Sequence, residues 1–100
     1  MELNDYPDRK RNNLRRYGIT LEQYDEMMLK QNGVCAICQQ HETMKNSKGI
    51  VCNLSVDHDH ITGRVRGLLC RNCNIGLGCF SDNINLMRSG IAYLSKSLPL

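Results

Sequence analysis

Apolar side chains recur at helical spacing in the first third of the chain. They are Leu21, Tyr24, Met27 and Met28. Thr20 and Gln23 are spaced as in a capping box, and Gly33 follows the last turn, so we predict a helix here with one buried stripe. Methionines at this spacing are far more typical of a core than of a ligand site, and we assign them to the core.

Two further helices are predicted at the ends of the chain. The C-terminal one runs from about residue 83 to 95, and Ser81 or Asp82 is expected to be the residue that starts it. Its apolar face consists of Ile84, Met87, Ile91 and Leu94. A short basic helix is predicted over residues 8–17, closed by Gly18.

The middle of the chain has the pattern of a hairpin. Residues 39–53 are polar with few periodic features, which predicts a loop or an irregular hairpin. A strand leads through residues 54–56, a turn is expected at 61–63, and a returning strand at 64–69. One or two helical turns over 74–78 follow. The order predicts a small α+β protein.

Composition narrows the class of protein. The chain has 100 residues, 41% of them hydrophobic and none of them tryptophan. A core built from so few large side chains is thin, so an additional constraint on the fold is expected. The first residues are polar, and no apolar run approaches the length that spans a bilayer, so we expect neither a signal peptide nor a membrane segment.

Four of the six cysteines form two C-x-x-C pairs, which supply that constraint. The pairs are Cys35 with Cys38 and Cys70 with Cys73. Two tight turns of this kind complete a tetrahedral thiolate site, which suits zinc. The alternatives are a redox dithiol, which needs a βαβ setting, and unligated buried thiols. Cys52 and Cys79 belong to no pair, and we expect them to be small buried residues outside the site.

A cluster of two carboxylates and two imidazoles lies between the cysteine pairs. It comprises Asp57, His58, Asp59 and His60. A neutral imidazole can take a proton from water, a carboxylate and an amide oxygen can hold a hard divalent cation, and arginines can bind phosphates. The sequence thus contains the parts for metal-assisted phosphodiester hydrolysis. A solvated loop and a second metal site are the alternatives.

This region closely resembles the recombination endonuclease VII family of HNH, or His-Me finger, nucleases. The matching motifs are Y-G-I-T-L-E-Q-Y at residues 17–24, V-D-H-D-H at 56–60, R-V-R-G-L-L-C at 64–70 and C-N at 73–74. The resemblance implies a zinc-stabilised ββα-metal domain with flanking helices, in which a hairpin and a helix surround one catalytic Mg²⁺ or Mn²⁺. We expect a single domain over residues 1–100, with basic N-terminal helices at 1–33, the finger at 35–78 and a C-terminal helix at 81–100.

The resemblance also implies a role for each motif residue. The structural zinc would be bound by Cys35, Cys38, Cys70 and Cys73. Asp57 and Asn74 would hold the catalytic metal, and His58 would be the general base that activates water. We interpret Asp59 and His60 as residues that support the metal ligands or contact phosphate, with His60 as the alternative base.

Basic residues gather at the start of the chain and around the cluster. The formal net charge of +3 permits an anionic partner without requiring one. Beside a nuclease site, we expect these residues to contact the DNA backbone, which positions a duplex without reading its sequence. They are Arg9, Lys10, Arg11, Arg15, Arg16, Arg64, Arg66 and Arg71. For the N-terminal group, a solvated helix face is the alternative.

The residues and the resemblance together predict a metal-dependent endonuclease that nicks or cuts duplex, nicked or branched DNA. We expect a monomer or a homodimer in the cytoplasm of a bacterial or phage-infected cell, with no membrane partner. Leu77 stands one turn after Asn74, where some family members have an acidic residue. The alternative function is a non-catalytic zinc module that binds nucleic acid or protein, and such a module needs neither Asp57, His58 nor Asn74.

Overall fold

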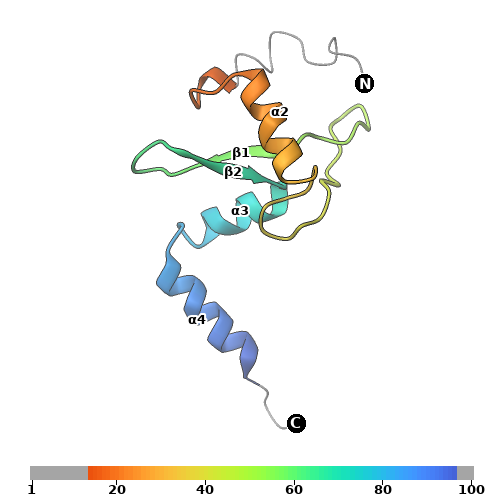
Figure 1. Cartoon of the computed structure of the whole chain (residues 1–100). Coiled ribbons are helices and arrows are strands. Elements are labelled where there is room, and N and C mark those ends of the chain that lie inside the picture. The colour runs from red at the N-terminus through yellow and green to blue at the C-terminus, as the bar shows by residue number, and fades with distance from the viewer. Residues whose placement is uncertain (1–13, 97–100) are drawn as a thin grey trace.

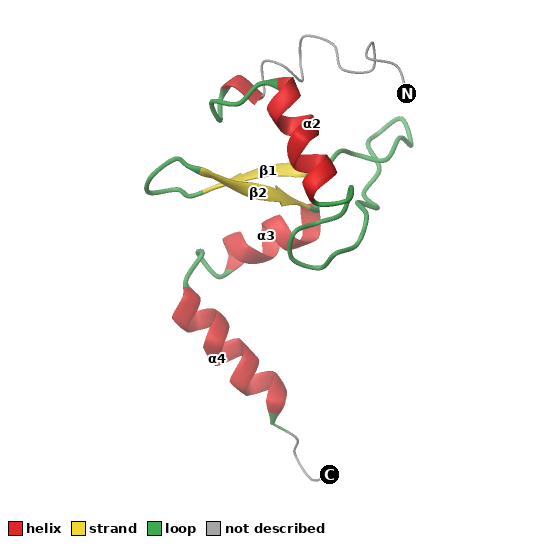
Figure 2. Ribbon diagram, viewed as in Figure 1, coloured by secondary structure: helices red, strands yellow, loops and turns green. Residues whose placement is uncertain are grey.

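A two-stranded antiparallel sheet lies at the centre of the molecule, between two helices (Figure 1). The computed structural model describes residues 14–96. In chain order the elements are α2 (Leu21–Lys30), β1 (Ser55–His58), β2 (Val65–Leu69), α3 (Arg71–Cys79) and α4 (Ile84–Ser95). Helix α2 packs on β2, helix α3 packs on both strands, and α4 extends away from the sheet (Figure 2). The predicted α+β class is confirmed, while most of the predicted helix over 8–17 lies outside the described residues.

Helix α2 begins and ends where the sequence predicts. The hydroxyl of Thr20 accepts the N–H of Gln23 at 3.1 Å, and the Gln23 side chain accepts the N–H of Thr20 at 2.8 Å. At the other end, the N–H of Gly33 donates to the carbonyl of Met28 at 2.8 Å, and Gly33 has a φ of +74°. A glycine takes this left-handed conformation without a steric penalty, which ends the helix.

The predicted stripe of α2 faces the core. The buried residues are Leu14, Leu21, Tyr24, Cys35, Leu54, Leu68, Leu69 and Cys70. Met27 and Met28 pack against this cluster from its edge, so their assignment to the core is confirmed. The hydroxyl of Tyr24 donates to the carbonyl of Leu54 at 2.6 Å, which ties α2 to the start of the hairpin.

The side chain of Gln31, just after α2, acts as an extension of the sheet. Its Oε1 accepts the N–H of Leu68 at 3.0 Å, and its Nε2 donates to the Leu68 carbonyl at 3.0 Å. Ala36 also donates its N–H to that carbonyl, at 3.1 Å. These hydrogen bonds hold the turn of the first cysteine pair, Cys35 and Cys38, against the outer edge of β2.

The hairpin contains a register shift that the sequence pattern does not reveal. Asp57 pairs with Gly67, whereas the next residue, His58, pairs with Val65. Arg66 is therefore the extra residue of a β-bulge. The second strand begins at Val65, one residue later than expected.

Helix α3 is longer than predicted, because it begins at Arg71 rather than near residue 74. Its N-cap is Cys70, whose sulfur accepts the N–H of Cys73 at 3.4 Å. A carboxylate oxygen of Glu42 accepts the N–H of Arg71 at 2.7 Å. A thiol and a glutamate distant in sequence thus accept the first N–H groups of the helix. The usual N-cap residues are Ser, Thr, Asp and Asn, so the sequence pattern did not indicate this start.

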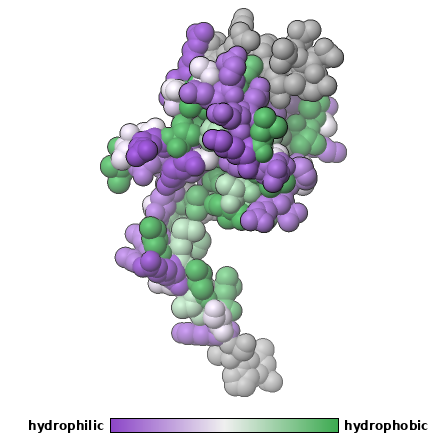
Figure 3. Space-filling view, viewed as in Figure 1, coloured by the Kyte–Doolittle hydropathy of each residue, from purple (hydrophilic) through white to green (hydrophobic). Residues whose placement is uncertain are grey.

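Helix α4 forms as predicted but does not pack on the core. Its N-cap is Asn83, whose Oδ1 accepts the N–H of Leu86 at 2.9 Å, so the expected start at Ser81 or Asp82 is wrong. Most of its predicted apolar face is exposed, with Ile91 at 65% and Leu94 at 81% of full accessibility, while Met87 is half-buried. Hydrophobic residues accordingly appear on the surface of this projecting segment (Figure 3). None of the helices within residues 14–96 is long and apolar enough to cross a membrane.

Candidate functional site

The structure brings the four predicted zinc ligands together. The sulfur atoms of Cys35, Cys38, Cys70 and Cys73 all lie within 4.8 Å of one another. Those of Cys38 and Cys70 are 3.8 Å apart. Tetrahedral zinc, with Zn–S distances of about 2.3 Å, separates its sulfurs by roughly 3.8 Å. The cluster therefore has the donor atoms and the size to hold a metal such as zinc.

Each cysteine pair is shaped by its local backbone. In the first pair, Gln39 returns its N–H to the carbonyl of Cys35 at 3.0 Å, and Gln39 adopts a φ of +60°. The N–H of Ile37 donates to the Cys35 sulfur at 3.4 Å. In the second pair, Cys70 caps α3 and Cys73 lies in its first turn. A loop and a helix start thus present the four sulfurs to one point.

The electrostatics of the cluster favour a cation. Burial raises the pKa of the Cys35 thiol, but N–H groups of Cys70, Cys38 and Ile37 outweigh that effect and lower the pKa to about 6. Burial and the neighbouring sulfurs raise the pKa of Cys73 to about 12. One thiolate therefore opposes the formation of the next, and a bound divalent cation removes that opposition.

The two remaining cysteines lie outside the cluster, as expected. Cys52 is half-buried and Cys79 is exposed. The expectation that both are buried is wrong for Cys79, which is exposed as the last residue of α3, and Cys52 is only partly buried.

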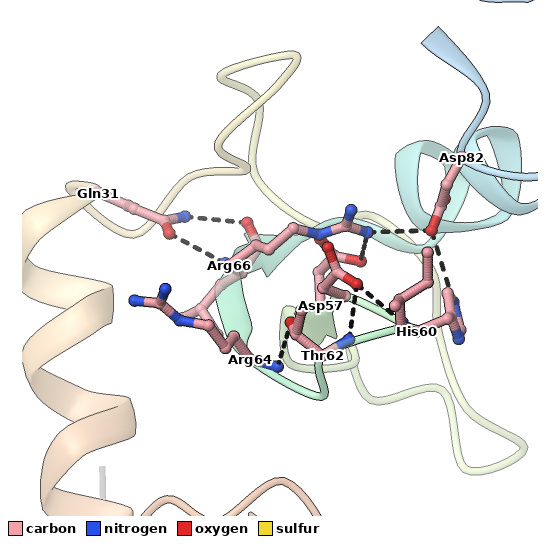
Figure 4. A network of polar contacts seen from close by, with 10 residues as sticks. Gln31, Asp57, His60, Thr62, Arg64, Arg66 and Asp82 are labelled. Carbon is pink, nitrogen blue, oxygen red and sulfur yellow. Dashed lines mark hydrogen bonds and ion pairs between the residues drawn. The ribbon is translucent and has the colours of Figure 1, made fainter.

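Asp57 is the buried carboxylate of the hairpin. Its residue is 8% exposed, and both of its oxygens accept hydrogen bonds from Arg66 (Figure 4). Arg66 Nε donates to Oδ2 at 2.7 Å and Nη2 donates to Oδ1 at 3.0 Å. Arg66 is the bulge residue next to the Asp57–Gly67 pair of the sheet. The bulge therefore occurs at the same place as the contact between Arg66 and Asp57. A side chain predicted to contact DNA thus binds a carboxylate of its own chain.

A second carboxylate, that of Asp82, reaches the same guanidinium from the turn before α4. Arg66 Nη2 donates to Asp82 Oδ2 at 3.3 Å. The hydrogen bonds with Asp57 raise the pKa of Arg66 further above its usual range, so the group stays cationic. Asp82 also lies 3.7 Å from Nε2 of His60.

The two histidines of the motif lie side by side. The ring centroids of His58 and His60 are 4.7 Å apart, and the ring of Tyr17 lies 5.0 Å from that of His58. His58 is half-buried, whereas the side chain of His60 is 69% exposed. His58 is the better confined of the two imidazoles.

Asp59 has the contacts of a turn residue. Its Oδ1 accepts the N–H of Ile61 at 2.8 Å and that of Thr62 at 3.0 Å. Hydrogen bonds from Thr62 and Ile61 lower the pKa of the Asp59 carboxyl. Its evident contribution is to close the tip of the hairpin, which turns the chain between the two motif strands.

Asn74 lies on α3, the helix that packs against β1 and β2. It is half-buried, and within residues 14–96 its side-chain amide has no hydrogen-bond partner. Asp57 and Asn74 therefore stand on packed elements and offer one carboxylate and one amide oxygen. Hard oxygen donors of this kind suit Mg²⁺ or Mn²⁺.

The remaining basic residues fall into two groups. Arg9, Lys10 and Arg11 lie outside the described residues. Those at the surface are Arg15, Arg16, Arg64 and Arg71. Their exposure leaves them able to meet a polyanion, and contact with DNA stays a prediction for both groups.

Three residues of the site were not assigned to it from the sequence. Asp82 was considered only as a helix start, Glu42 fell in a loop, and Tyr17 was assigned to no site. The contacts of Asp82 and Glu42 join residues 16 and 29 positions apart. No pattern of neighbouring residues predicts contacts over such separations in the sequence. Tyr17 lies before α2, and its place beside His58 depends on how that segment folds back on the hairpin.

Comparison with known proteins identifies a family. A protein-family model described as recombination endonuclease VII matches residues 10–96. A relative named Gene 59 protein, from Mycobacterium phage D29, is 47% identical over 81 residues, which cover 80% of this chain and 46% of that protein. The Gene 59 protein of Mycobacterium phage L5 is 46% identical over 79 residues, covering 78% and 44%. The chain spans less than half the length of these curated relatives.

Proposed function

Because the chain belongs to the recombination endonuclease VII family, we propose that it is a metal-dependent endonuclease that hydrolyses phosphodiester bonds in DNA, whether duplex, nicked or branched. One observation carries the proposal. The hairpin with Asp57 and His58 packs on the helix with Asn74, and the cysteine cluster joins the two. This arrangement matches the ββα-metal finger that the motifs imply.

Zinc has a structural role in this proposal. The first cysteine pair precedes the hairpin, and the second lies where β2 passes into α3. A metal held by all four sulfurs would fix both ends of a finger whose core is thin, and its binding energy would contribute to folding.

The catalytic cation would be held by Asp57 and Asn74. When bound, Mg²⁺ or Mn²⁺ stabilises the negative charge that develops on the reacting phosphate and on the leaving oxygen. The protein's part is to present a carboxylate from β1 and an amide from α3 with the spacing that their packing fixes. HNH-type chemistry at these residues is our proposal.

His58 is proposed as the general base. The rings of Tyr17 and His60 both lie against its imidazole, which restricts the orientation of the ring. A neutral ring nitrogen can remove a proton from the attacking water. His60 is more exposed and faces Asp82, which makes it the second candidate for this role.

The DNA itself would be held by the exposed arginines. Arg64 precedes β2 in the chain and Arg71 follows it. We propose that both bind phosphates next to the one that is cleaved. Arg15 and Arg16, with the basic residues before them, would contact the backbone at a greater distance. Such contacts give affinity that falls steeply with salt and carries no sequence information.

Plasmid nicking in the presence of Mg²⁺ or Mn²⁺ tests the proposal. We expect His58→Ala to reduce the nicking rate by at least about 100-fold, which is typical for the loss of a general base. His41→Ala is the matched control, because His41 is exposed and lies outside the motif. Equal nicking by the wild type and His58→Ala would overturn the assignment of the base. A wild type that binds DNA without cleaving it would favour the non-catalytic zinc module.

A further inference from the structure

Asp82 is the second carboxylate bound by Arg66, and none of the functional roles above includes it. It lies in the turn between α3 and α4 with a φ of +55°, and its N–H donates to the carbonyl of Leu77 at 2.9 Å. Asp is one of the non-glycine residues that adopt this left-handed conformation in turns. The turn brings Asp82 beside the hairpin, where its carboxylate meets Arg66 and His60.

Arg66 stands between two cavities. One, of about 450 Å³, is lined by residues that include His60 and Asp82. The other, of about 270 Å³, is lined by residues that include Asp57 and Leu77. Arg66 lines both, and its guanidinium contacts Asp57 in one and Asp82 in the other.

The contacts of Arg66 are stronger on the Asp57 side. The two bonds to Asp57 measure 2.7 and 3.0 Å, and the single bond to Asp82 measures 3.3 Å (Figure 4). The side chain of Asp57 is 10% exposed and that of Asp82 is 22% exposed. A bidentate pair of this kind engages both oxygens of the carboxylate.

A divalent cation on Asp57 conflicts with this pair. The cation and the guanidinium compete for the same carboxylate, and their positive charges repel at short range. One Arg66 nitrogen already touches Asp82, so the guanidinium has a second acceptor within reach. No acidic residue occurs in α3, and the Asp59 carboxylate, which lines the same cavity as Asp82, accepts N–H groups of the hairpin tip. Asp82 is therefore the carboxylate on this side that is hydrogen-bonded to Arg66.

We infer that Asp82 is a positioning residue of the metal site, which takes up the Arg66 guanidinium when a divalent cation binds Asp57. The inference rests on the proposed function, because it requires Asp57 to be a metal ligand. Arg66 then competes with the metal for the Asp57 carboxylate. The α3–α4 turn, which carries Asp82, weakens this competition. Asp82 acts through Arg66 and does not itself touch the cation.

Calorimetric titration of Mn²⁺ into the full chain, purified with one equivalent of zinc, tests the inference without measuring activity. Asp82→Asn should weaken Mn²⁺ binding by about three- to tenfold, because Arg66 then stays on Asp57. Arg66→Gln should tighten binding by a similar factor. In the Arg66→Gln background, Asp82→Asn should have no further effect, since the residue through which Asp82 acts is gone.

Three further proteins complete the experiment. Asp25→Asn, which neutralises an exposed carboxylate on α2, should bind as the wild type does. Asp82→Glu keeps an acceptor for Arg66 and should lie closer to the wild type than Asp82→Asn, which separates a lost charge from a disturbed turn. Asp57→Ala should abolish the binding that the other variants alter.

The outcomes separate the inference from the function on which it rests. Equal weakening by Asp82→Asn with and without Arg66 would show a direct or structural effect and overturn the inference, as would weaker binding in Arg66→Gln. Unchanged binding in Asp82→Asn would overturn it too. Mn²⁺ binding that does not depend on Asp57 would overturn the metal site of the proposed function, and the inference with it.

Discussion

Asp57 and His58 illustrate how far single residues could be identified from sequence. The motif and its position between two cysteine pairs pointed to them, and the structure places both on β1. The bidentate contact of Asp57 with Arg66 was not predicted, because it accompanies a bulge that shifts the register by one residue. A strict alternation of faces leaves the Arg66 side chain free to bind DNA, whereas in the structure the partly exposed guanidinium binds Asp57.

Glu42 gives a residue-scale prediction with a definite pH dependence. Burial raises the pKa of its carboxyl, but N–H groups of Met44, Arg71 and Thr43 lower it by more, so the net pKa is below 4.5. The carboxylate therefore stabilises the fold above pH 4.5, and this contribution is lost as the pH falls through the lowered pKa.

We expect Glu42→Gln to lower the free energy of unfolding by about 0.5 to 1 kcal/mol at pH 7, since Glu42 caps α3 from an only partly buried position. Chemical denaturation at a series of pH values measures the difference from the wild type, which should shrink below pH 4.5. Glu26→Gln, an exposed change on α2, is the control. A difference that persists unchanged at acid pH would contradict the role of this carboxylate.

At the scale of elements, sequence patterns succeeded where the capping chemistry was ordinary. Thr20 and Gln23 made the start of α2 predictable, and the observed capping box confirms it. The start of α3 was misjudged because its N-cap is the thiol of Cys70, a residue already assigned to zinc. One side chain serves both purposes, so the cysteine cluster and the first turn of α3 should be lost together.

We expect Cys70→Ser to abolish stoichiometric zinc binding and to unfold the finger, with loss of helical signal in circular dichroism. Chelation of zinc from the wild type should have the same effect. Cys79→Ser removes an exposed thiol outside the cluster and should keep both zinc and fold. An apo-protein with the full helical signal would show that the metal is not structural.

At the scale of the whole molecule, α4 shows that a helix can be predicted from sequence while its packing cannot. The spacing of its apolar residues correctly indicated a helix, but periodicity cannot say what an apolar face meets. Most of the face is exposed on a helix that projects from the sheet (Figures 1 and 3). The stability of the finger should therefore depend little on it.

Leu94→Glu should change the free energy of unfolding by less than about 0.5 kcal/mol, as expected for an exposed position. Leu68→Ala, a change at a fully buried position of β2, should cost roughly 2 to 5 kcal/mol. Denaturant titration followed by near-ultraviolet circular dichroism compares the two. A large loss of stability in Leu94→Glu would mean that α4 is part of the core.

The central claim is that Asp57 and Asn74 form a catalytic centre for DNA hydrolysis. The most direct measurement is the single-turnover cleavage rate of an end-labelled DNA duplex and of a matched branched substrate in Mn²⁺, with zinc content and fold verified for each protein. Asp57→Ala and Asn74→Ala should each lose at least about 100-fold in rate, while Asn85→Ala, an exposed change on α4, should cleave as the wild type does. Cleavage by folded Asp57→Ala and Asn74→Ala at the wild-type rate would contradict the claim.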